Sequence, residues 1–119
     1  MLEVFDHGPV REIRLAKPPV NALGAALAAA LDEALAAAYA AGADDGSGVR
    51  AVVLSGRPGM FSAGLDIREV TGPAEGLRAL LTAFFRLQQR IATGPLPVVC
   101  AITGHSPAGG AVFAILCDH

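Results

Sequence analysis

Short β-branched runs alternate with long helical stretches along this chain, and this alternation limits the possible fold more than any other feature. The runs Val49–Leu54 and Val98–Ile102 are apolar at nearly every position, which is typical of buried strands in a parallel sheet. The stretches Leu23–Ala41 and Ala74–Ala92 carry apolar residues at spacings of three and four, as amphipathic helices do. Strands and helices in alternation predict an α/β fold in which helices cover a parallel sheet.

Glycine and proline mark where the predicted elements end. Val4-Phe5 and Val10–Leu15 flank a His-Gly-Pro turn and are expected to be two short strands. Gly42 and the loop Asp44–Gly48 end the first long helix, and Gly94-Pro95 ends the second. No internal repeat or linker is visible, so the 119 residues are expected to lie within one domain.

Composition and charge argue against several classes of function. The formal net charge is −2, whereas nucleic-acid modules usually show a basic excess. Cys100 and Cys117 are too few for a disulfide scaffold and have no ligand cluster around them for a metal site, so we interpret them as buried thiols of a cytoplasmic protein. The first ten residues include Glu3 and Asp6 and contain no apolar stretch, unlike a signal peptide.

The segment Leu96–Cys117 is the one feature that suggests a membrane. Apart from His105 it carries no titratable charge, and it is long enough to span a bilayer. Prolines and glycines interrupt it, however, and no cluster of lysine or arginine flanks it. We therefore expect a strand followed by a helix here, and we expect neither a membrane nor a nucleic acid as partner.

Two loops rich in small residues follow the predicted buried strands, at the sheet edge where α/β folds bind ligands. The first loop is Gly59–Asp66 and the second is Thr103–Gly110. Ser106 is a favourable N-cap and Pro107 a favourable first helical residue, so the last helix is expected to begin there. Amides at this helix start, including that of Gly109, would suit an anion or a developing oxyanion. Spacing alone leaves a second interpretation open, in which these glycines only allow close packing of the helix on the sheet.

Three motifs, in this order, resemble the crotonase superfamily, which is the enoyl-CoA hydratase/isomerase family. They are Pro18-Pro19-Val20-Asn21-Ala22-Leu23, then Phe61-Ser62-Ala63-Gly64-Leu65-Asp66-Ile67, then Pro97-Val98-Val99 through Gly104-His105-Ser106-Pro107-Ala108-Gly109-Gly110 to Cys117-Asp118. The resemblance covers nearly the whole chain. Gly64-Leu65 and Ser106-Pro107, with Arg57-Pro58-Gly59 ahead of them, are most similar to Δ3,Δ2-enoyl-CoA isomerases. The resemblance implies a crotonase-like fold of ββα repeats, with residues 1–119 as the N-terminal part of one domain.

The resemblance also implies a substrate and a site. The family binds acyl-CoA thioesters and stabilises an enolate with two backbone N–H groups, which here would belong to Leu65 and Gly109. Ala63, Gly64, Asp66 and Ile67 match the loop that holds the adenine and pantetheine parts of coenzyme A. Coenzyme A is then part of the substrate, and no separate cofactor or metal is expected. The full-length protein would be a homo-oligomer, a trimer or a hexamer.

One departure from the family pattern narrows the expected reaction. Hydratases of the family carry a glutamate where this chain has Val112, which can neither take nor give a proton. Isomerases tolerate an apolar residue there, and their single carboxylate lies beyond His119. The leading prediction is therefore an isomerase that moves a double bond from the 3 to the 2 position of an enoyl-CoA. The alternatives are another acyl-CoA reaction of the family, such as hydration, hydrolysis or decarboxylation, and a non-catalytic truncated protein that binds coenzyme A or a partner.

Several other residues are weighed against simpler structural roles. For Asp66 a loop-capping carboxylate is favoured over a proton carrier, and for His105 a loop role is favoured over catalysis. Ser62 lacks the strand–elbow–helix pattern of a nucleophile. Lys17 is equally compatible with a contact to a coenzyme A phosphate and with a solvated side chain.

Overall fold

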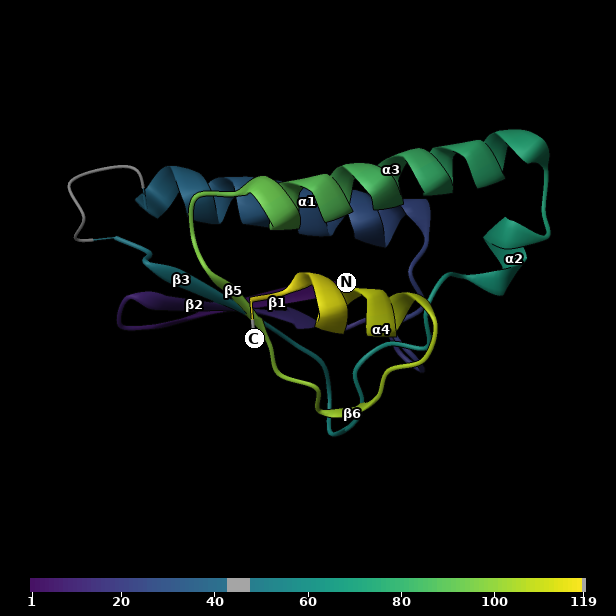
Figure 1. The fold of residues 1–119 in the computed structure, drawn as a ribbon. Helices are drawn as coiled ribbons and strands as arrows, with labels where there is room; N and C mark the ends of the chain where they lie inside the picture. The colour runs from purple at the N-terminus through teal and green to yellow at the C-terminus, as the bar shows by residue number, and fades with distance from the viewer. Residues whose placement is uncertain (43–47, 119) are drawn as a thin grey trace.

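The computed structural model describes residues 1–42 and 48–118, and a four-stranded sheet forms its centre (Figure 1). The strand order is β1-β2-β3-β5, with β1 antiparallel to β2 and the other neighbours parallel. The bounds are β1 Leu2–His7, β2 Val10–Leu15, β3 Ala51–Ser55 and β5 Val98–Cys100. The first two strands form a hairpin because Gly8, at a φ of 62°, and Pro9 make the turn between them.

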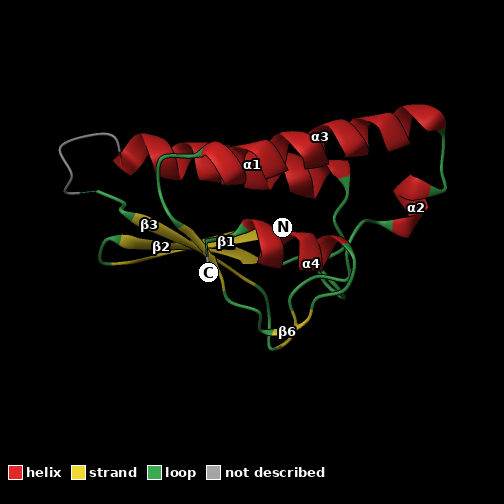
Figure 2. Cartoon of the chain, in the orientation of Figure 1, coloured by secondary structure: helices red, strands yellow, loops and turns green. Residues whose placement is uncertain are grey.

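A smaller parallel pair and four helices complete the fold (Figure 2). The pair consists of β4 and β6, and the elements are β4 Gly59–Met60, β6 Gly104–His105, α1 Ala25–Gly42, α2 Ile67–Val70, α3 Ala74–Thr93 and α4 Gly109–Leu116. Two successive units therefore have the same order: β3 and β4 precede α3, and β5 and β6 precede α4. This arrangement confirms the predicted α/β class with ββα repeats.

The core lies between the larger sheet and the two long helices, α1 and α3, which run side by side above it (Figure 1). Alternate residues of the strands point toward these helices, and Ile13, Leu15, Val52, Leu54 and Val98 are all buried. The helices bury apolar residues at helical spacing against the sheet. These residues are Leu27, Leu31 and Leu35 from α1 and Leu80, Phe84, Leu87 and Ile91 from α3. An ion pair between Asp32 and Arg90 joins the two helices at the edge of this layer.

The long helices agree with their sequence prediction to within two residues, but the last helix does not. It begins at Gly109, and Ser106 and Pro107 lie outside it. The prediction of Ser106 as N-cap and Pro107 as first helical residue was therefore wrong. Strand β6 pairs with β4 just before this point, and the chain then needs residues 106–108 to turn away from the strand.

The membrane-length segment Leu96–Cys117 does not form one continuous helix. It contains β5, β6 and α4, as its prolines and glycines indicate. A different helix, α1, is long and apolar enough to cross a membrane by length and composition alone, but it is the helix that packs its leucines into the core. The predicted loop Asp44–Gly48 falls mostly outside the described residues, and so does His119.

Candidate functional site

A cleft of about 380 Å³ opens where the loop after β4 meets the segment between β2 and α1. The loop after β4 contributes Ala63, Leu65, Asp66 and Ile67. These are four of the six residues for which the sequence resemblance implies a contact with the acyl-CoA substrate. The other wall comes from Lys17, Pro18, Pro19, Val20 and Ala22, and Arg68 also lines the cleft. Gly64 does not line this cleft. A larger hollow of about 730 Å³ shares Pro18 with this cleft and includes Glu12, Arg14 and Ser55 in its lining.

The Leu65 amide has a direction that is fixed by the carbonyl of its own peptide. The C=O of Gly64 accepts a hydrogen bond of 2.8 Å from the N–H of Leu23. The C=O and N–H of a trans peptide point in opposite directions, so the Leu65 N–H points away from Leu23. Gly64 has a φ of 95°, and this conformation, which is strained for residues with a Cβ, turns its carbonyl toward Leu23. The next N–H, that of Asp66, donates a hydrogen bond of 2.9 Å to the C=O of Leu23 and so holds the loop on the other side of Leu65.

The Gly109 amide is directed by the same principle. The C=O of Ala108 accepts hydrogen bonds from the N–H groups of Ala111 at 3.0 Å and Val112 at 3.2 Å, and therefore points along α4. The N–H of Gly109 belongs to the same peptide and points out from the start of the helix, where the helix dipole favours negative charge. Ala108 has φ 48° and ψ −117°, as at the second residue of a type II′ turn, and this conformation is strained for alanine.

Close packing joins the two loops that carry these amides. A Cβ at Gly110 would lie 2.7 Å from the carbonyl oxygen of Ser62, so only glycine allows α4 to approach the first loop this closely. Strands β4 and β6 are also paired in register, Gly59 beside Gly104 and Met60 beside His105. The packing interpretation of these glycines and the oxyanion interpretation are thus compatible, because the packing itself brings the two amide-bearing loops together.

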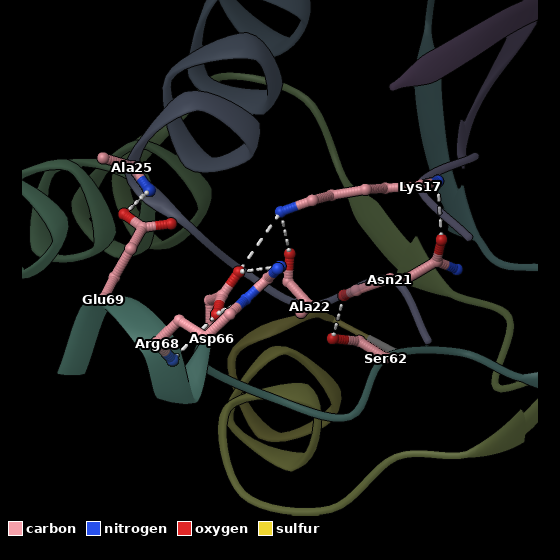
Figure 3. Close-up of polar contacts among 8 residues, drawn as sticks. All are labelled: Lys17, Asn21, Ala22, Ala25, Ser62, Asp66, Arg68 and Glu69. Carbon is pink, nitrogen blue, oxygen red and sulfur yellow. Dashed lines mark hydrogen bonds and ion pairs between the residues drawn. The ribbon is translucent and has the colours of Figure 1, made fainter. Parts of the chain in front are cut away.

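A buried polar network that the sequence prediction missed supports the first loop (Figure 3). The side chain of Asn21 accepts a hydrogen bond from the Lys17 N–H at 2.8 Å and donates one to the Phe61 carbonyl at 2.9 Å. The Ser62 hydroxyl donates to the carbonyl of Asn21 at 2.8 Å and accepts from the Gly64 N–H at 3.1 Å. Asn21 and Ser62 are both fully buried. Ser62 therefore holds the loop in place, as expected for a residue without a nucleophile pattern.

Asp66 begins helix α2, as the loop-capping interpretation predicts. Its carboxylate accepts from the Arg68 N–H at 3.0 Å and lies 3.3 Å from the Arg68 guanidinium and 3.7 Å from Lys17 Nζ. Hydrogen bonds from Arg68 lower the pKa of this carboxyl group, which keeps it ionised. Lys17 Nζ also donates to the Ala22 carbonyl at 3.1 Å, so this lysine is held at the cleft wall and is not simply solvated.

The Glu69 carboxylate and the Val112 side chain both have structural contacts. The Glu69 carboxylate accepts the Ala25 N–H at 2.9 Å and thereby ties α2 to the first turn of α1 (Figure 3). Val112 packs against the hydrophobic core, as an apolar residue in place of the hydratase glutamate would. His105 is exposed in β6. In the described part of the chain, no cluster of three or more His, Cys, Asp or Glu side chains is arranged to hold a metal ion.

The family model for enoyl-CoA hydratase/isomerase matches residues 6–119, with the cleft, both amides and both ββα units inside the match. The chain belongs to the enoyl-CoA hydratase/isomerase family. Its similarity extends to proteins with different reactions in their names. It is 38% identical over 109 residues to a peroxisomal bifunctional enzyme of Danio rerio, covering 90% of this chain and 14% of the relative. It is 35% identical over 118 residues to a probable enoyl-CoA hydratase of Rhizobium meliloti, covering 98% and 44%.

Solved structures of the family match this chain along its whole length. The crystal structure of human mitochondrial delta3-delta2-enoyl-CoA isomerase superposes with a TM-score of 0.89 at 32% identity, covering 99% of this chain and 45% of that one. The chain thus spans less than half the length of these members of the enoyl-CoA hydratase/isomerase family. Both isomerases and hydratases occur among them, so family membership is shown and the particular reaction is not.

Proposed function

We propose that this chain supplies the acyl-CoA-binding half of an enoyl-CoA isomerase, which shifts a double bond from the 3 to the 2 position. The observation that carries the proposal is the pair of peptides Gly64–Leu65 and Ala108–Gly109. Each has its carbonyl engaged within the fold, so its N–H is directed away from that contact. Two fixed donors of this kind, in loops that pack on each other, suit a thioester oxygen that becomes negative in the transition state.

The reaction needs one proton to leave and one to arrive. Loss of a proton from C2 of a 3-enoyl thioester gives a dienolate, whose negative charge on oxygen would be stabilised by the Leu65 and Gly109 amides. Return of a proton to C4 then leaves the double bond between C2 and C3. One carboxylate suffices for both transfers, and we place it beyond residue 119, as in the isomerases that the motifs resemble. Within the candidate site, Asp66 is engaged by Arg68 and Lys17, and Glu69 by the start of α1.

The cleft between Lys17 and Arg68 is the proposed place for coenzyme A. Lys17 and Arg68 put two cations beside Ala63, Leu65 and Ile67, and cations of this kind bind phosphate groups. The Arg68 side chain is 86% exposed, so it can turn toward a ligand. Exposed apolar side chains on three helices, Ile67 at 71%, Phe85 at 60% and Ile115 at 82%, are consistent with a further proposal, that the full protein assembles as a homo-oligomer.

A protein that also contains the proposed carboxylate beyond residue 119 should be assayed with two substrates that separate the candidate reactions. Isomerisation of a 3-enoyl-CoA creates a conjugated thioester and raises its ultraviolet absorbance, whereas hydration of crotonyl-CoA removes conjugation and lowers it. We expect the first signal and only background for the second, because Val112 removes the hydratase carboxylate. Faster hydration than isomerisation would overturn the proposal.

Two alternatives remain as outcomes of the same experiment. Release of a free thiol, detected with a chromogenic disulfide, would indicate a thioester hydrolase. Binding of acyl-CoA by calorimetry without any turnover would indicate a non-catalytic binding protein. Leu65 and Gly109 would keep their place in the binding site under either outcome, but the proposed proton transfer would be wrong.

A further inference from the structure

The two cysteines of the chain meet at the junction between β5 and the end of α4, although they are 17 residues apart in the sequence. Cys100 is the last residue of β5, and Cys117 directly follows α4. Their sulfur atoms lie 2.8 Å apart. This separation is only about 0.8 Å longer than a disulfide bond, so rotation of the two side chains by a small amount is enough to close it.

The main chain holds the two cysteine-bearing segments together from both sides. The Asp118 N–H donates to the Val98 carbonyl at 2.8 Å, and the Val98 N–H donates back to the Asp118 carboxylate at 2.8 Å. The Phe113 carbonyl oxygen accepts from the Cys117 N–H at 3.0 Å, and the Cys100 sulfur lies 3.5 Å from the same oxygen. These contacts fix β5 and the end of α4 relative to each other, and they therefore hold the two sulfur atoms close together.

The two thiols also differ in acidity, as the two cysteines of a reactive dithiol do. A hydrogen bond from the Cys100 thiol lowers the pKa of Cys117, and the same contact, together with burial, raises the pKa of Cys100. Cys117 is thus the better thiolate, and Cys100 is the thiol that stabilises it. Cys117 is 9% exposed and Cys100 is half-buried. Neither cysteine lines the candidate cleft.

We propose that Cys100 and Cys117 form an oxidation site, a dithiol that a low-molecular-weight disulfide converts into an intramolecular disulfide. The Cys117 thiolate attacks one sulfur of the reagent and releases one small thiol, leaving a mixed disulfide. Cys100 loses its proton to water and attacks the Cys117 sulfur of that mixed disulfide, releasing the second small thiol. Two protein thiols are oxidised, and one molecule of reagent is reduced to two thiols.

The disulfide encloses the candidate oxyanion loop. Residues 103–110, with Gly109 among them, lie between the two cysteines, so the bond closes this segment into a ring anchored at the end of β5 and the end of α4. Closing a loop restricts the unfolded chain more than the folded one, and oxidation should raise the melting temperature. This inference rests on the sulfur geometry and does not depend on the reaction that the protein catalyses.

The test is thiol–disulfide equilibrium with glutathione disulfide and glutathione on the full chain. After quenching with an alkylating reagent, peptide mapping by mass spectrometry reports free, mixed-disulfide and crosslinked forms of Cys100 and Cys117. We expect the native protein to form the Cys100–Cys117 crosslink and to lose it with dithiothreitol. The effective concentration of the two thiols should be about tenfold or more higher in the native protein than in the protein unfolded by urea. The reason is linkage: if the disulfide stabilises the fold, the fold stabilises the disulfide by the same free energy.

Single variants provide the matched controls. Cys100→Ser should leave Cys117 as a glutathione mixed disulfide under the same conditions, and Cys117→Ser should leave Cys100 mostly free because burial still raises the pKa of its thiol. Three results would each overturn the proposal: mixed disulfides that persist on both cysteines of the native protein, crosslinks between chains, or equal effective concentrations with and without urea. The wild-type comparison stands even if a variant folds poorly.

Discussion

The substitution Gly110→Ala tests whether the packing of α4 on the first loop sets the geometry of the candidate oxyanion site. A Cβ at this position would lie 2.7 Å from the Ser62 carbonyl oxygen and 2.9 Å from the Ser106 hydroxyl. The Ser62 oxygen is a backbone atom and cannot rotate away. Ordinary contact begins at 3.4 Å, so α4 and the first loop must separate by roughly 0.7 Å.

A displacement of this size exceeds the roughly 0.5 Å within which a catalytic arrangement works well. Complete loss of one oxyanion donor costs on the order of 10²–10³ in kcat, so partial misplacement should cost about 10–100-fold. Crowding at a packed position should also destabilise the fold by about 1–3 kcal/mol. KM should change little, because Lys17 and Arg68 at the coenzyme A cleft remain in place.

Gly76→Ala is the matched control for this experiment. A Cβ at Gly76 meets no atom within 4 Å, and its place in α3 means that alanine should add up to about 1 kcal/mol of stability with kcat unchanged. Isomerase activity of the full chain and urea unfolding should be measured for both variants. If Gly110→Ala retains wild-type kcat per folded molecule, α4 does not position a catalytic donor and the reasoning fails.

Three further perturbations test other parts of the structure. Hydrogen bonds from Ser55 and Arg14 lower the pKa of Glu12 to about 2, so the stability from these contacts is present above the ordinary pKa of about 4.5 and is lost as the pH falls toward 2. Glu12→Gln should remove that part of the pH dependence, on the order of 1 kcal/mol after solvent screening, and an unchanged slope in urea unfolding would contradict the assignment. Asn21→Ala should cost about 2–4 kcal/mol, since it abolishes two buried hydrogen bonds and places alanine at a φ of 51°; a loss below about 1 kcal/mol would show that the network contributes little. Ala108→Gly should raise stability by up to about 1 kcal/mol by relieving a φ of 48°, and a lower melting temperature would show that the turn is not strained.

The long elements were predictable from the sequence because their signals are local and repeated. Leucines at every fourth position of α1 and the apolar face of α3 specify helices whatever lies around them, and β3 and β5 are short apolar runs with glycine or proline nearby. The start of α4 was not predictable in this way. Ser106 and Pro107 satisfy local capping rules, but pairing of β6 with β4 and the approach of Gly110 to Ser62 decide where the helix begins.

The buried polar network that supports the first loop could not be predicted from the sequence, for a related reason. The contacts of Asn21 with Phe61 and Ser62 join residues 40 and 41 positions apart, and no local pattern specifies such pairs. One signal was present in the sequence: asparagine tolerates the left-handed conformation better than most residues, and Asn21 follows two prolines and a valine in a segment that cannot be helical. That signal indicates a turn and does not reveal its partner.

The ββα repeat brings together the two loops that carry the proposed backbone donors, although these loops are far apart in the sequence. Leu65 lies five residues after Met60, and Gly109 lies four residues after His105, while Met60 and His105 are register partners in β4 and β6. Paired strands lie about 4.8 Å apart. Both loops therefore start from neighbouring strands, and the close approach of Gly110 to the Ser62 carbonyl keeps them together further along. The donors therefore need no reactive side chain. The proposed role requires only that the carbonyls of Gly64 and Ala108 are held by the fold, and both accept backbone hydrogen bonds within it.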